Sequence, residues 1–137
     1  MKKLIYIFAF ALITTLTFAQ EKTYQLSSHI LDVSKGMPAA NVPIKLEKYN
    51  TDKKTWTVLD EKITDMNGRV PDFLPNMKGK SNDGIYKLTF ITNDYFEKDK
   101  IESFYPFVEV VFQIKDANHY HVPITLSAFG YSTYRGN

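Results

Sequence analysis

Short runs of alternating apolar and polar residues, each closed by turn-forming residues, fill this chain from residue 23 onward. In one of them Val42, Ile44 and Leu46 alternate with polar side chains, and further along Asn67-Gly68 is a strong tight-turn signal. Successive side chains of a strand point to opposite faces, so the pattern predicts strands with one buried face. Seven runs carry it: 23–33, 42–50, 55–64, 84–92, 107–116, 119–127 and 131–135. Their spacing predicts an all-β fold, an antiparallel β-sandwich, with one short helix within 93–104.

Two prolines fall inside these runs, Pro43 and Pro123. Proline has no backbone N–H to donate to a neighbouring strand. We therefore expect both at sheet edges, bulges or strand starts.

The first residues form a separate segment. "MKK" is basic, residues 4–18 are apolar, and Thr17-Phe18-Ala19 is a small-x-small cleavage site, which together predict a secretory signal peptide over residues 1–19. Of 137 residues, 118 then remain as one domain, 20–137, long enough for a proper core. No cysteine lies near the cleavage point, so no lipid anchor is expected, and no second apolar run is long enough to span a membrane.

Charge and cysteine content exclude several classes of function. The 17 basic residues less the two leader lysines leave 15, against 15 acidic residues. Nucleic acids and anionic membranes select a positive surplus, so neither is expected as a partner. The cysteine count is zero, which removes disulfides, a thiol nucleophile and thiolate metal ligation.

The three histidines are the first candidates for chemistry. His29 lies in the first run, and His119 and His121 are two apart in "HYHVP", so they point to one face of a strand while Tyr120 packs on the other. Taken singly, each histidine is most simply an ordinary surface or half-buried residue. His-x-His with a distant histidine also resembles a zinc-ligand set, but no HExxH motif and no carboxylate at ligand spacing accompany it. The serine-nucleophile elbow GxSxG is absent too.

Arg69 and the C-terminus are the remaining candidates. Arg69 follows the Asn67-Gly68 turn, where an exposed arginine is the ordinary interpretation and an oxygen-binding clamp the functional one. The chain ends on "GYSTYRGN", a strand-like sequence with two tyrosines and an arginine. Free termini are usually polar and poorly ordered, so this ending suggests that it belongs to a site.

Several stretches carry a family resemblance: "LSSHILDVSKGMPAANVPIKLEK", "ITDMNGRV", "GIYKLTFITNDYF" and "FYPFVEVVFQIKDANHYHVPITLSAFGYSTYRGN". Together they resemble 5-hydroxyisourate hydrolase, the enzymatic branch of the transthyretin family, from about residue 24 to the end. "HYHVP" and "YSTYRG" are the specific parts. The hormone carrier transthyretin lacks these histidines and the Tyr-Arg-Gly ending, so the chain is more similar to the enzyme.

The resemblance implies a transthyretin-like sandwich of two four-stranded sheets with one short helix. It also implies a homotetramer, a dimer of edge-paired dimers around a channel, and periplasmic localisation, which the leader fits. The catalytic residues that it implies are His29, Arg69 and His121, with no metal and no cofactor.

The terminal residues would contact substrate beside His29 and Arg69: Tyr134, Arg135, Gly136 and Asn137. The family typically ends in Ser, and Asn137 cannot lose a proton as a hydroxyl can. A role as a proton shuttle therefore does not carry over to it. For His119 we expect a supporting or structural role.

The implied reaction is hydrolysis of 5-hydroxyisourate to 2-oxo-4-hydroxy-4-carboxy-5-ureidoimidazoline in urate degradation. A histidine activates a water that attacks a ring carbonyl, because imidazole is the side chain that titrates near neutrality. Two alternatives stay open: a non-enzymatic transthyretin-like carrier of a small ligand, and an exported sandwich with a structural or sugar-binding role.

Overall fold

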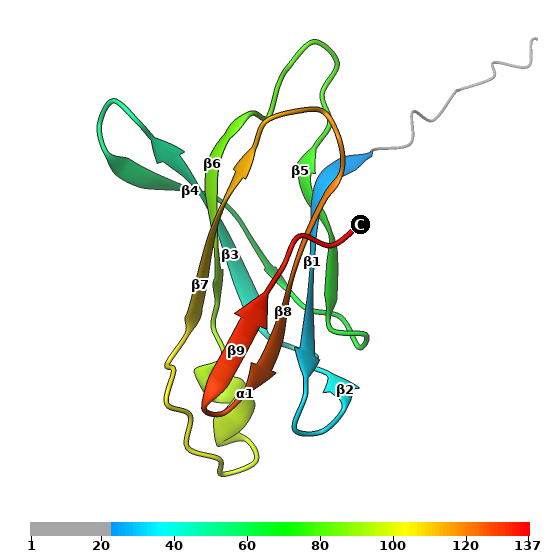
Figure 1. The fold of residues 1–137 in the computed structure, drawn as a ribbon, viewed down its shortest axis with the longest axis vertical. Helices are drawn as coiled ribbons and strands as arrows, with labels where there is room; N and C mark the ends of the chain where they lie inside the picture. The colour runs from blue at the N-terminus through cyan, green and yellow to red at the C-terminus, as the bar shows by residue number, and fades with distance from the viewer. Residues whose placement is uncertain (1–22) are drawn as a thin grey trace, which may run out of the picture.

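The computed structural model describes residues 23–137, and the signal peptide predicted over 1–19 lies outside these residues. Within residues 23–137, nine strands and one short helix follow one another (Figure 1). They are β1 (Tyr24–Asp32), β2 (Met37–Pro38), β3 (Pro43–Asn50), β4 (Thr55–Ile63), β5 (Arg69–Pro75), β6 (Gly84–Phe90), α1 (Asn93–Glu97), β7 (Val108–Ile114), β8 (Tyr120–Ser127) and β9 (Gly130–Thr133). Within the described part of the chain, no helix has the length and apolar character needed to cross a membrane.

The strands form two sheets, which confirms the predicted sandwich. One sheet has the order β2-β1-β8-β9, with β5 also paired to β1, and the other has the order β4-β3-β6-β7. The two-residue β2 extends the first sheet beyond the four strands expected. One pairing departs from the antiparallel pattern, because β1 and β8 run parallel.

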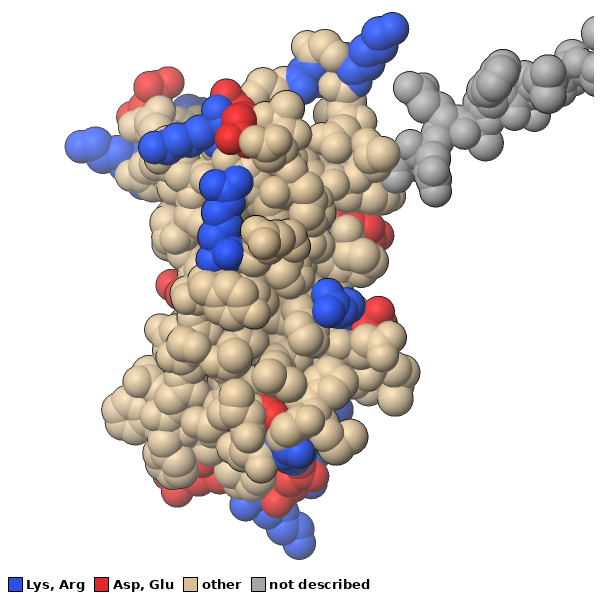
Figure 2. All heavy atoms as spheres, turned by 45° about the vertical axis from the view of Figure 1, so that its right-hand side comes forward, with Lys and Arg blue, Asp and Glu red and all other residues tan. Residues whose placement is uncertain are grey.

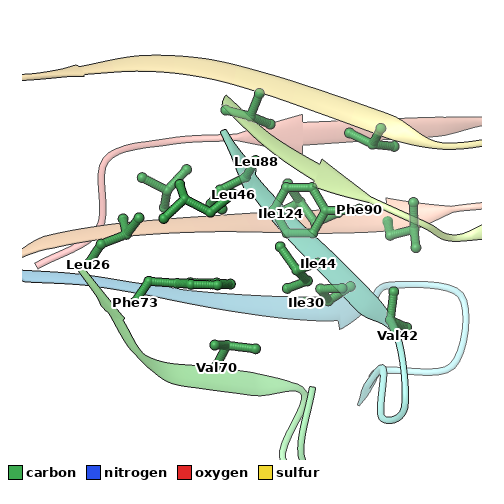
Figure 3. Close-up of a cluster of buried hydrophobic side chains, with 14 of the residues drawn as sticks. Leu26, Ile30, Val42, Ile44, Leu46, Val70, Phe73, Leu88, Phe90 and Ile124 are labelled. Carbon is green, nitrogen blue, oxygen red and sulfur yellow. The ribbon is translucent and has the colours of Figure 1, made fainter. Parts of the chain in front are cut away.

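The core lies between the sheets and is built from the alternate side chains of their inner faces. Leu26 and Ile30 of β1, Phe73 of β5 and Ile124 of β8 meet the inward residues of β3 and β6 there (Figure 3). Tyr120 is 5% exposed and packs in this core, as its alternation with the two histidines predicted. The residues between the buried ones on β1 therefore face outward, and this outer face carries the candidate site.

Three boundaries differ from those expected. Helix α1 covers only Asn93–Glu97 of the range 93–104. Residues 69–75, which none of the seven expected runs covers, form β5, because pairing with β1 outweighs its two prolines. The last strand ends at Thr133 instead of residue 135.

Proline placement explains where the last strand ends. Pro43 opens β3, as expected of a strand proline. Pro123 lies inside β8, and the β8–β9 pairing stops at Ile124 and Thr133, directly beside it. The register resumes only as an isolated bridge between His121 and Gly136. Pro123 has no N–H to donate to the ladder. Its carbonyl accepts a hydrogen bond from Thr133 Oγ1 at 2.8 Å.

Candidate active site

Three neighbouring strands bring the predicted histidines and arginine onto one face. In the parallel β1–β8 pair, Ser27 lies opposite His121 and His29 opposite Pro123. On the other side of β1, Arg69 at the start of β5 lies opposite His29. Paired residues share a face of a sheet, so Ser27, His29, His121 and Arg69 all project from the outer face of the first sheet.

A tight turn fixes the backbone of Arg69 beside β1. The Asp65 carboxylate accepts hydrogen bonds from the N–H groups of Asn67 at 2.8 Å and Arg69 at 2.9 Å. Gly68 has a φ of +69°, and a Cβ there would lie 2.6 Å from the carbonyl oxygen of Ile30. Only glycine fits both the conformation and the contact. The Arg69 side chain is solvent-exposed, at the position where it can contact a ligand.

The environment lowers the pKa of both half-buried histidines. Burial is the larger cause for His29, followed by the positive charge of Arg69, while a backbone contact to Asn67 and the Asp65 carboxylate oppose them. For His121, burial lowers the pKa first, and then the charges of Arg69, His29 and His119. Both imidazoles are therefore neutral and able to accept a proton at neutral pH.

A serine with no role predicted from the sequence joins the two histidines of "HYHVP". Ser27 Oγ lies 2.8 Å from His119 Nε2 and 2.8 Å from His121 Nδ1. The two rings thus share a side of the strand, as expected. Ser27 was detectable in principle, since it precedes His29 by two residues and so shares its face.

The geometry does not complete a metal-ligand set around these histidines in the described residues. Among residues 23–137, no three His, Cys, Asp or Glu side chains converge in a way that could hold an ion. The nitrogens of His119 and His121 that face each other are joined through a hydroxyl instead.

The C-terminal segment divides between two places. Gly136 lies against the site, since its N–H donates to the His121 carbonyl at 2.8 Å and a Cβ there would lie 2.5 Å from Cδ2 of the His121 ring. Tyr134 and Arg135 instead line a cavity of about 490 Å³ beside β7, with Arg135 stacked 4.5 Å over the Tyr120 ring. The residues that line this cavity do not include His29, and Asn137 is exposed. Their substrate contacts stay a prediction.

Comparison with known proteins assigns the chain to a protein family. The model of the HIUase/Transthyretin family matches residues 26–136. The chain belongs to this family. A relative from Caenorhabditis elegans described as a probable 5-hydroxyisourate hydrolase is 45% identical over 134 residues, which is 93% of this chain and 92% of the relative.

Solved structures of both branches of the HIUase/Transthyretin family resemble this chain. The 5-hydroxyisourate hydrolase of Klebsiella pneumoniae is 32% identical with a TM-score of 0.67, over 82% of this chain and 98% of that one. Sea bream transthyretin in complex with thyroxine is 29% identical with a TM-score of 0.73, over 82% and 94% of the two chains. The fold thus resembles both the hydrolase and the transthyretin, so fold alone does not distinguish the two functions and the site residues have to be considered.

Proposed function

We propose that this protein is an enzyme that hydrolyses 5-hydroxyisourate, opening its six-membered ring to 2-oxo-4-hydroxy-4-carboxy-5-ureidoimidazoline. The observation that carries the proposal is the convergence of His29, His121 and Arg69 on one outer face. A carrier of a hydrophobic ligand needs neither two neutral imidazoles nor a guanidinium there. The relatives named as 5-hydroxyisourate hydrolases support the same choice.

His121 acts as the general base in this proposal. It takes a proton from water while the water oxygen bonds to the attacked ring carbonyl carbon, and it returns the proton to the ring nitrogen as the C–N bond breaks. A base for this step must be unprotonated near neutrality, which the lowered pKa of His121 ensures. His29, with its own lowered pKa, orients the water or the substrate.

Arg69 binds the heterocycle and stabilises the oxyanion that develops on the attacked carbonyl. A guanidinium remains charged at every working pH and can hold two oxygens at once. After burial, its charge is the next cause that lowers the pKa of both histidines. Arg69 thus both stabilises the transition state and favours the unprotonated form of the base.

We further propose that the protein assembles into a homotetramer through the open edges of β7 and β9, which end their sheets. Large apolar side chains lie exposed along these edges and in the loops beside them: Phe104, Phe107, Val111, Phe129, Tyr131 and Tyr134. In Figure 2 most charged side chains lie towards the two ends of the molecule, and the visible face between them is mainly tan with a few isolated charged side chains. Uncovered strand edges and apolar patches of this kind are stable when paired with another copy. Assembly would also give Tyr134, Arg135 and Asn137 a route to the substrate.

Export to the periplasm is the corresponding proposal for localisation. It is supported by the basic and apolar leader and by the cleavage site at Ala19. Amino-terminal sequencing of the protein recovered from a periplasmic fraction should begin at Gln20. Recovery of the intact leader in the cytoplasm would refute export.

The function is tested by the ultraviolet decay of freshly generated 5-hydroxyisourate. The wild-type protein should accelerate the decay above the spontaneous rate, His121→Ala should lower kcat by about 10²–10⁴-fold, and Arg69→Ala by about 10²–10³-fold. No acceleration by the wild type, together with saturable binding of an aromatic ligand, would instead support the carrier. Activity lost on chelation and restored by zinc would revive the metal hypothesis.

A further inference from the structure

Ser27 occupies a bridging position that the general-base mechanism does not use. It is half-buried on β1, and its Oγ lies within 2.8 Å of one nitrogen of His119 and one of His121. At the far end of this chain of contacts, His119 Nδ1 lies 3.1 Å from the backbone carbonyl oxygen of Tyr24. Four groups are thus linked in a row, with a carbonyl at one end and the candidate base at the other.

The carbonyl fixes the direction of every hydrogen bond in the row. A carbonyl oxygen can only accept, so His119 Nδ1 donates to it. A neutral imidazole carries one ring proton, so His119 Nε2 has none and must accept from the Ser27 hydroxyl. That hydroxyl has a single proton, which leaves Ser27 Oγ to accept from His121 Nδ1.

The consequence for His121 is a defined tautomer. With its ring proton held on Nδ1, the neutral ring keeps the lone pair of Nε2 free. A general base needs this lone pair directed at the water. Burial lowers the pKa of this ring, and so do its ionisable neighbours Arg69 on β5, His29 on β1 and His119 just before β8, which together favour its neutral form.

We propose that Ser27 and His119 are positioning residues that hold His121 in the tautomer with Nε2 unprotonated. The proposal rests on the proposed function only for the role of His121 as base. It gives His119, the first histidine of "HYHVP", a defined role. Because His119 donates to the Tyr24 carbonyl, it accepts from Ser27, and Ser27 in turn accepts from the His121 ring. It also explains why Ser27, on the outer face, is a hydroxyl residue.

The tautomer can be measured without substrate. In protein labelled with ¹⁵N-histidine at pH 8, two-bond ¹H–¹⁵N correlations distinguish an Nδ1–H ring from an Nε2–H ring. We expect Nδ1–H for His121 in the wild type and in Ser27→Thr, and a mixture or the Nε2–H form in Ser27→Ala and His119→Phe. An Nε2–H ring for His121 in the wild type would overturn the proposal, whatever the enzyme's substrate.

Kinetics give an independent test. Ser27→Ala should lower kcat about ten-fold, the loss of one hydrogen bond worth about 1.4 kcal/mol in the transition state, with KM changed by less than about two-fold. Ser27→Thr should restore most of the rate because it restores the hydroxyl. Equal losses in both variants, or no loss in Ser27→Ala, would overturn the proposal. If the wild type does not hydrolyse 5-hydroxyisourate, the proposed function fails, while the tautomer measurement still tests the positioning.

Ser28→Ala is the matched control. Ser28 is the next residue of β1, but it is buried and its Oγ donates to the Val122 carbonyl at 2.8 Å. Its loss should lower the urea midpoint of unfolding and leave both kcat and the His121 tautomer unchanged. If Ser27→Ala fails to fold, His119→Phe decides, because His119 is exposed and its loss removes the acceptor for Ser27 together with one contact to the Tyr24 carbonyl. Retention of the Nδ1–H tautomer in folded His119→Phe would count against the proposal.

Discussion

Adding a single methyl group at Gly136 should disable the site without unfolding the protein. The backbone N–H of Gly136 donates to the backbone carbonyl of His121, and a Cβ at this position would lie 2.5 Å from Cδ2 of the imidazole and 3.2 Å from its Cγ. Carbon atoms in contact prefer separations of about 3.5–4.0 Å. The Gly136→Ala variant must therefore move the ring or the terminal segment by about 1 Å.

A displacement of this size is large for catalysis and small for stability. A misplacement of about 1 Å in a reacting group can cost about 10²-fold in rate. Only an isolated bridge joins Gly136 to β8, so its loss should change the free energy of unfolding by no more than about 1 kcal/mol. We therefore expect kcat for Gly136→Ala to fall about 10²-fold with nearly unchanged urea unfolding.

Gly130→Ala is the control for the same substitution elsewhere in the C-terminal region. A Cβ at Gly130 meets only Ser127 Oγ, at an ordinary 3.8 Å, and its φ is not in the left-handed range. In the ultraviolet assay, this variant should accelerate the decay of 5-hydroxyisourate at the wild-type rate. Wild-type kcat in Gly136→Ala would refute the argument that the terminal segment holds the His121 ring.

Three further predictions concern pH, the turn before β5 and the terminus. Because burial and neighbouring positive charges lower the pKa of His29 and His121 below the ordinary 6.5, the unfolded chain binds these protons at a higher pH than the folded chain. The free energy of unfolding should thus rise with pH up to about 6.5 and level off above it. Urea midpoints of unfolding measured from pH 5 to 8 check this. An equally steep rise in the double variant His29→Asn/His121→Asn would contradict it. Asp65→Ala removes the acceptor for two backbone N–H groups and should cost about 1–2 kcal/mol of stability together with activity, whereas Asp65→Asn keeps the acceptor and should lose less. Deleting residues 134–137 should abolish hydrolysis and leave a cooperatively folding sandwich, because β9 ends at Thr133; loss of the unfolding transition would show that the tail is structural.

Most strands and several side-chain faces could be predicted from local sequence patterns, because side chains along a strand alternate with a period of two residues. Alternation identified the runs that form the core strands, and it placed Tyr120 inward between His119 and His121. It missed β5 because Pro71 and Pro75 lower the strand signal, and such prolines are tolerated only where the ladder does not need their N–H. Resemblance supplied the roles of His29, Arg69 and His121, which no single spacing could assign.

The sequence by itself determined most of the strands, the shared face of His119 and His121, and the membership of a family with a hydrolase branch. Only the tertiary structure decided which residues meet across strands. Ser27 and His121 are 94 positions apart, and the parallel register of β1 and β8 that brings them within hydrogen-bond distance is set by packing of the inner faces. For the same reason the structure alone shows that Gly136 lies against the His121 ring while Arg135 stacks on Tyr120. Pairing between distant segments is a property of the whole core, and no local window of residues contains it.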